Sequence, residues 1–183
     1  MRRFGLALAS MLVCGSAIAQ WVSDGSDNPF DKTQMRWVFT ASSSGIGFGF
    51  RCEGSDPDNA ALLFITNERA TDEAATNLSL LSPQLSIIVD DGERHDLAAR
   101  IDAVEMTGTS MLRVIVNGES AIVSAERIGN AKRRVSVALS VMGKTFHATN
   151  FGVRGSRKEI ANAFKACGIS RGDVVKCVVL DVD

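Results

Sequence analysis

Short runs of alternating apolar and polar residues, separated by turn residues, fill most of the chain between residues 35 and 153. In residues 46–52, Ile46, Phe48 and Phe50 alternate with small or polar residues, as in a half-buried strand. Asn117-Gly118 and Met142-Gly143 each lie between two such runs and predict tight hairpin turns. The strands predicted in this way, or hairpins of two strands, cover residues 35–41, 46–52, 60–66, 84–92, 93–106, 110–126 and 133–153.

The hydrophobic period changes near the end of this region, and the change predicts a helix over residues 156–167. Ser156 and Glu159 have the spacing of a capping box, so Ser156 is the predicted N-cap. Gly168 follows the last helical residue, where a positive φ commonly ends a helix. One face of this helix is apolar and carries Ile160, Ala163, Phe164 and Cys167.

Many short strands and a single late helix predict a mainly β fold: an antiparallel β-sandwich or a strongly curved sheet, capped by one C-terminal α-helix. The β-rich domain is expected to span residues 35–168. Residues 20–34 form a polar segment before this domain, and residues 169–183 form a β-prone tail after it. Length and composition indicate one domain with a sizeable core.

Residues 1–19 have the pattern of a secretory signal peptide. Arg2 and Arg3 precede a short apolar run, and the segment closes with small residues at Ala17 and Ala19. We therefore expect Gln20 to be the mature N-terminus and the mature protein to be periplasmic or secreted. Lipidation at Cys14 is the alternative, but Val13 stands where a small residue normally precedes a lipidated cysteine.

Export would leave three cysteines in an oxidising compartment. The favoured disulfide joins Cys52 to Cys167, because it ties an early strand to the last helix and would stabilise the fold by about 4–5 kcal/mol in the chain-entropy model. A Cys167–Cys177 disulfide is the alternative and would close only a local turn. In the first case Cys177 is left as a free thiol or as an intermolecular partner.

The chain offers few residues for catalysis, and its only histidines are His95 and His147. Both fall on predicted strands, where a solvent-facing structural role is the simpler interpretation. The sequence has no GxSxG elbow, phosphate-binding loop or cysteine pair with metal-ligand spacing, so we expect no catalytic residues, no cofactor and no metal. A small hydrolase that uses His95 or His147 with a nearby acid is kept as an alternative.

Charge and aromatic content argue against two classes of partner. The formal net charge is −1, and removing Arg2 and Arg3 with the signal makes it more negative, which disfavours nucleic acid. After residue 19 the chain has no apolar run of about 20 residues, so we expect no stable membrane insertion. Trp21 and Trp37 are the only tryptophans, and tyrosine is absent. Trp37 is expected in the core, and Trp21 against a sheet edge.

Several short motifs together resemble a family of periplasmic accessory proteins associated with type VI secretion, and related exported β-domains. The motifs are Trp21-Val22, NPFDKT (28–33), FGFRC (48–52), ARID (99–102), and the pattern of residues 151–167. The resemblance implies a β-rich periplasmic domain with a Cys52–Cys167 disulfide and a role in binding other envelope proteins. The chain departs from the family at residues 104–106, which lack the usual tryptophan, and in the tail after Gly168.

The sequence therefore predicts a non-catalytic accessory protein that binds an envelope or secretion-system protein through an exposed sheet face or edge. An inhibitor of a foreign hydrolase would have the same sequence features and is the second possibility. The oligomeric state is not predicted.

Overall fold

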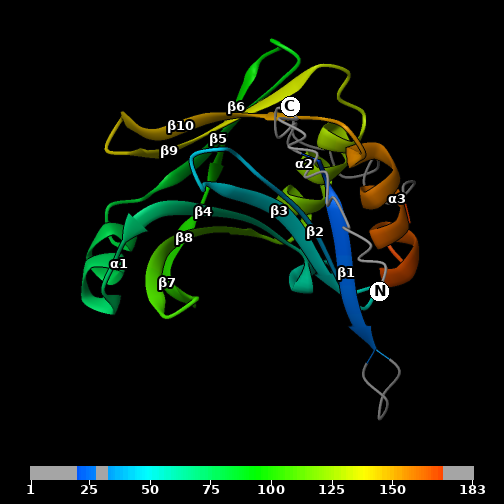
Figure 1. The fold of residues 1–183 in the computed structure, drawn as a ribbon, viewed down its shortest axis with the longest axis horizontal. Coiled ribbons are helices and arrows are strands. Elements are labelled where there is room, and N and C mark those ends of the chain that lie inside the picture. The colour runs from blue at the N-terminus through cyan, green and yellow to red at the C-terminus, as the bar shows by residue number, and fades with distance from the viewer. Residues whose placement is uncertain (1–19, 28–32, 171–183) are drawn as a thin grey trace, which may run out of the picture.

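In a computed structural model, the structure describes residues 20–27 and 33–170 (Figure 1). The predicted signal peptide at residues 1–19 with Cys14, and the tail beyond Ser170 with Cys177, lie outside the described residues. Among the described residues, no helix is both long enough and apolar enough to cross a bilayer.

Two antiparallel sheets form the body of the molecule (Figure 1). One has six strands in the order β1-β2-β3-β4-β8-β7, and the other has four in the order β10-β9-β5-β6. The first comprises β1 (Val22–Asp27), β2 (Gln34–Ala41), β3 (Gly47–Glu53), β4 (Ala61–Arg69), β8 (Thr109–Asn117) and β7 (Arg100–Met106). The second comprises β10 (Lys144–Gly152), β9 (Arg134–Val141), β5 (Gln84–Val89) and β6 (Arg94–Ala98). The predicted fold class, a β-sandwich capped by a C-terminal helix, is confirmed.

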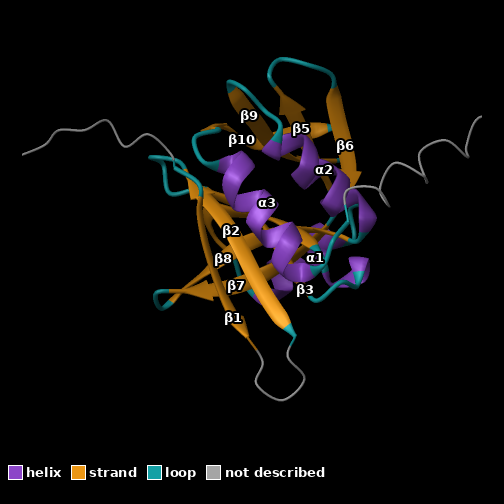
Figure 2. Cartoon of the chain, turned by 90° about the vertical axis from the view of Figure 1, so that its right-hand side faces the viewer, coloured by secondary structure: helices purple, strands orange, loops and turns teal. Residues whose placement is uncertain are grey.

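The described residues also form helices α1 (Asp72–Ser79), α2 (Glu119–Gly129) and α3 (Ser156–Cys167), with a 3₁₀ turn at Pro57–Asn59. The bounds of α3 are those predicted from the apolar face. Helices α2 and α3 pack against each other, and α3 lies on β2 and β3 with β1 at its side (Figure 2). Helix α1 packs against β7 at the other end of the six-stranded sheet (Figure 1).

Aromatic rings from both sheets and from α3 form the centre of the core. Phe48 on β3 stacks on Phe151 on β10 with ring centroids 5.5 Å apart. Phe50 on β3 meets Phe164 on α3 edge-on at 5.3 Å. All four side chains are almost completely buried. Because each such burial is worth about 1.5–3 kcal/mol, these contacts fix α3 and the second sheet against β3.

The hairpin predicted at Asn117-Gly118 is wrong. Asn117 ends β8, and Gly118 adopts a φ of 73° and leads into α2. A type I′ turn would need a positive φ at both central residues, and Asn117 has none. The residues after Gly118 repeat with helical period, which the sequence analysis took for a strand: the buried face of α2 carries Ala121, Ile122, Ala125 and Ile128.

The capping box predicted at Ser156 is also absent, although the helix starts where expected. Gly155 is the N-cap, with a φ of 90°, and no side chain caps this end. Ser156 is buried, and its hydroxyl donates to the carbonyl oxygen of Val153 at 2.9 Å. The Glu159 carboxylate accepts a hydrogen bond from Ser23 on β1 instead. Glu159 therefore joins α3 to the edge of the sheet.

Residues 20–27, which the sequence analysis set apart as part of a polar segment, belong to the folded sandwich. Trp21 is 2% exposed, and its indole N–H donates to the carbonyl oxygen of Gly152 at 2.7 Å. The strand β1 follows directly and pairs with β2. Trp21 thus anchors the start of β1 in the core, a deeper position than the predicted contact with a sheet edge.

Trp37 is not in the main core, where the sequence analysis placed it. It lies half-buried on the outer face of the six-stranded sheet, where it packs on a small cluster of Ala61, Leu63 and Ile115. The Arg51 guanidinium lies 5.5 Å from the centre of its ring. Alternation along β2 correctly placed Trp37 on one face, but did not distinguish the core face from the outer one.

The turn predicted at Met142-Gly143 is correct: these residues have φ values of 51° and 74° and join β9 to β10. The Asp-Gly step at residues 91–92 suggests a turn between β5 and β6, but the turn lies one residue earlier. Its central residues are Asp90 and Asp91, with φ values of 51° and 63°, and the Gly92 amide closes it by donating to the carbonyl oxygen of Val89 at 2.9 Å. The predicted run 93–106 divides at Ala99, whose amide donates to the carbonyl oxygen of Pro83, and its halves enter different sheets.

Candidate functional site

The two histidines do not form one site. His95 is on β6 and His147 is on β10, and these strands are the opposite edges of the four-stranded sheet. Three strand spacings of about 4.8 Å separate such edges. His147 lies in an irregularity of β10 between Phe146 and Thr149 and has a φ of 52°.

Asp96, the acid next to His95, is hydrogen-bonded to other residues. Asp96 pairs across the sheet with Ser86, and its carboxylate accepts hydrogen bonds from the Ser86 hydroxyl at 2.6 Å and from Arg94 Nε at 2.7 Å. These two hydrogen bonds, that from Ser86 first, hold the pKa of Asp96 below its usual value. Successive strand residues point to opposite faces, so His95 lies on the other face of β6. Ser86, His95 and Asp96 therefore do not form a catalytic triad.

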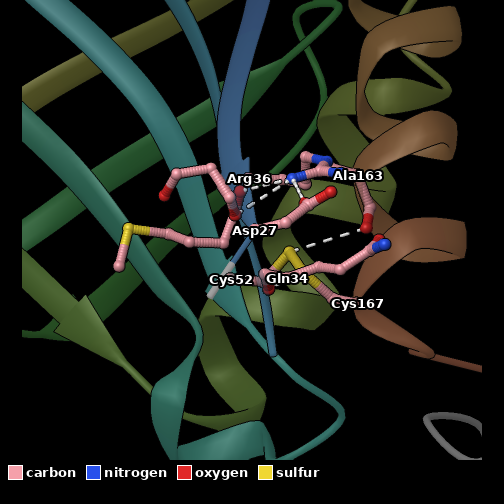
Figure 3. Close-up of a disulfide and its surroundings, with 8 residues drawn as sticks. Asp27, Gln34, Arg36, Cys52, Ala163 and Cys167 are labelled. Atoms are coloured by element: carbon pink, nitrogen blue, oxygen red, sulfur yellow. Dashed lines mark hydrogen bonds and ion pairs between the residues drawn. A yellow bond between two sulfur atoms is a disulfide. The ribbon is translucent and has the colours of Figure 1, made fainter. Parts of the chain in front are cut away.

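The predicted disulfide is present and joins Cys52 on β3 to Cys167 in the last turn of α3, with Cα atoms 6.2 Å apart (Figure 3). Its sulfur atoms lie against two backbone carbonyls: the Cys52 sulfur is 3.6 Å from the oxygen of Ala163, and the Cys167 sulfur is 3.7 Å from the oxygen of Gln34. Both cysteines are buried. The disulfide therefore holds the C-terminal end of α3 beside the start of β2.

Strand β1 is an open edge of the six-stranded sheet. Among the described residues it pairs with β2 alone, and all six of its residues are exposed. The strand is regular in register from Val22 to Asp27. An edge strand carries backbone N–H and C=O groups that can pair with a further strand.

A groove of about 280 Å³ lies between β1 and α3. It is lined by Ser23, Asp24, Gly25, Asp27, Arg36, Asn162 and Ala163. Asn162 also lines a second hollow at the end of α3, which reaches Lys165 and the disulfide residue Cys167. The open backbone edge of β1 thus runs beside a hollow whose other side is a helix held in place by the disulfide.

The side chain of Arg36, a residue of β2, lies in this groove and reaches β1 (Figure 3). Its guanidinium makes an ion pair with Asp27 at 2.8 Å and donates to the carbonyl oxygens of Met35 at 2.9 Å and Ser26 at 3.3 Å. Gly25 is required here, because a Cβ at this position would lie 2.6 Å from the Arg36 side chain. The glycine makes room for Arg36, and Arg36 fixes β1 to β2.

The charges along β1 are mainly negative. The Asp24 carboxylate accepts a hydrogen bond from the amide of Gly25 at 2.7 Å and makes no ion pair with any described residue. Acidic groups at an edge oppose uncontrolled pairing with other strands, and they also favour a partner with basic residues. The exposed side chains of this edge therefore include two carboxylates, those of Asp24 and Asp27.

The sequence predicts binding at an exposed sheet face or edge, but it does not identify β1 as that edge. Its residues, VSDGSD, lack the apolar alternation that marks a strand. The signal was in Trp21, whose burial fixes the strand that follows.

Within the described residues, no group of three or more His, Cys, Asp and Glu side chains is placed to hold a metal ion. Comparisons of the chain with family models, curated proteins and solved structures gave no match.

Proposed function

We propose that this chain is an exported, non-catalytic binding protein that takes up an extended segment of another envelope protein as an added strand on β1. The observation that carries the proposal is the open, regular edge of β1 beside the groove against α3. In recognition by strand addition, main-chain hydrogen bonds to the edge provide affinity, and hollows next to the edge select side chains.

In the described part of the chain, the other three edge strands are less suited than β1 to pairing with an added strand. The register of β10 is interrupted between Phe146 and Thr149, and an irregularity of this kind disrupts edge pairing. Strand β6 has only five residues. Strand β7 lies against α1, where the Ser79 hydroxyl accepts the amide hydrogen of Ile101 at 3.2 Å.

The expected ligand is an extended segment with basic and apolar residues. Asp24 places a negative charge on β1, on the same face as Trp37, and Asn162 and Ala163 supply the uncharged wall of the groove on the α3 side. Val22 is 58% exposed and would lie beside an added strand. Such a segment would form backbone hydrogen bonds with the exposed N–H and C=O groups of β1, and it would remove Val22 from water.

The experiment is affinity capture from an envelope extract with the mature chain and with Asn162→Trp, which would fill the groove from an exposed position on α3. The control is Arg157→Trp, which is also exposed but lies about 140° around the same helix. We expect a partner with the native chain and with Arg157→Trp, and its loss with Asn162→Trp. Equal capture by all three would refute the role of the groove.

Export is part of the same proposal and is tested separately. Fractionation of cells should place the protein in the periplasm or medium, with Gln20 as its first residue. Protein found in the cytoplasm with residues 1–19 still attached would refute export.

A further inference from the structure

Helix α3 ends beside the Asp27 end of β1, at one end of the groove. The last helical residue, Cys167, lies against Gln34, and Gln34 pairs with Asp27 at the end of β1. After the helix the chain reverses: Gly168 has a φ of 71°, and the amide of Ile169 donates back to the carbonyl oxygen of Phe164 at 2.9 Å.

The directions of α3 and β1 agree. Helix α3 starts beside Trp21, since a Cβ on Gly155 would lie 3.2 Å from the Trp21 carbonyl oxygen, and it ends beside Gln34. Strand β1 also runs from the Trp21 end of the sheet to the Gln34 end. A segment that reverses after α3 and follows β1 would therefore be antiparallel to it, as are all other neighbouring strands in the sheet.

The sequence that follows is suited to such a strand. Residues 173–182 read DVVKCVVLDV, which is rich in β-branched residues and apolar at both alternating sets of positions. A strand with this pattern needs cover on both faces. Beside β1 one face would meet the groove and α3, and the other would lie next to Val22. Lys176 would bring a positive charge to the acidic edge.

The lengths also fit. Strand β1 has six residues, which an added strand matches with about 20 Å of extended chain. Residues 168–172, GISRG, are left as the connection, a length within the usual range between a helix and a strand. So short a connection gives the segment an effective concentration of about millimolar, well above that of a second copy in dilute solution.

We propose that residues 173–182 dock within the same chain as an antiparallel strand on the free edge of β1, and that a partner segment must displace them. This inference rests on the groove of the proposed function, to which it adds an internal competitor. Docking multiplies the apparent affinity for the partner by the fraction of chains in which the edge is still open.

Hydrogen exchange in the absence of any partner tests the docking. The mature chain with Cys177→Ser, which prevents intermolecular disulfides, is compared with the same chain carrying Val178→Asp. A matched control carries Ser170→Asp, which adds the same charge before the proposed strand. We expect amides of residues 22–27 to exchange about tenfold faster in Val178→Asp, with no change at β7 and none in Ser170→Asp.

Equal exchange rates of the residue 22–27 amides in all three chains would overturn the inference. It would also be overturned if Val178→Asp speeds exchange of the β7 amides instead of those of residues 22–27. Protection that rises with protein concentration, together with a doubled mass in solution, would also overturn it, because docking would then be between two copies. The proposed function is tested by a separate measurement, the capture of a partner. If Val178→Asp still captures a partner but exchange is unchanged, only the docking fails. If exchange changes but no partner is captured by either chain, only the proposed function fails.

Discussion

The two edges of the six-stranded sheet are built in opposite ways. At one edge, α1 packs against β7, and Ile101 on β7 is 3% exposed. At the other, every residue of β1 is exposed, and a disulfide holds the neighbouring helix in place. The difference shows that an open edge in this protein is not a general property of the sheet. One edge packs against a helix, whereas among the described residues β1 pairs with β2 alone, beside a helix that the disulfide holds in place.

Removing the disulfide should have the largest effect, a loss of stability of the whole domain. Cys52→Ala with Cys167→Ala should lower the free energy of unfolding by about 4–5 kcal/mol, because the 115-residue separation is no longer cross-linked in the unfolded chain. Urea unfolding measures the change. Both chains carry Cys177→Ser, so that no other disulfide forms. A loss below about 1 kcal/mol would contradict the role given to the disulfide.

Truncating one apolar side chain at each edge should reproduce the contrast directly. Ile101→Ala on β7 should cost about 3 kcal/mol, because it leaves a cavity under α1. Val22→Ala on β1, made in the Val178→Asp chain so that residues 173–182 do not cover it, should cost less than about 0.5 kcal/mol, since Val22 is 58% exposed. Both values come from the shift of the urea midpoint. Similar losses at the two positions would show that the edges do not differ in packing.

The ion pairs at the two edges should differ less. On the β7 side, Arg113 makes two hydrogen bonds to Asp102, at 2.8 and 2.7 Å, and the hydrogen bond to Asp102 raises the pKa of Arg113. Asp102→Ala should cost about 1 kcal/mol. Asp27→Ala, which removes the more exposed pair with Arg36, should cost roughly 0.3 kcal/mol. Stability measured at low and high salt checks this, and a larger loss at Asp27 would reverse the comparison.

The smallest effect should come from the carboxylate on the open edge. Asp24→Ala frees the amide of Gly25 and should leave the free energy of unfolding unchanged within about 0.5 kcal/mol. It should also increase self-association, because a charge that opposes edge pairing is lost. Sedimentation at several concentrations measures this. An unchanged monomer fraction would mean that Asp24 does not protect the edge.

The sequence predicted those parts of the fold in which local and long-range signals agree. The apolar face of α3 and Gly168 both pointed to a helix over residues 156–167, and Met142-Gly143 carried the turn geometry that its hairpin needed. The cysteine pairing followed from the compartment and the reach of the crosslink.

The failures occurred where one local signal has two structural solutions. Gly118 supplies a positive φ either to a hairpin or to the start of a helix, and the packing of α2 on α3 decides between them. Alternation around Trp37 fixes a face but not which face is buried. The candidate site was the least predictable part, because β1 is held by β2 and Trp21 and has no apolar pattern of its own.

Addition of an extended strand to β1 beside α3 can be tested with peptides selected from a random library against the mature chain carrying Val178→Asp. Amide exchange is then measured in the complexes. We expect extended peptides that slow exchange at residues 22–27, leave exchange at residues 100–106 unchanged, and fail to bind when Asn162→Trp is added. Peptides that bind the Asn162→Trp chain equally well and protect another region would contradict it.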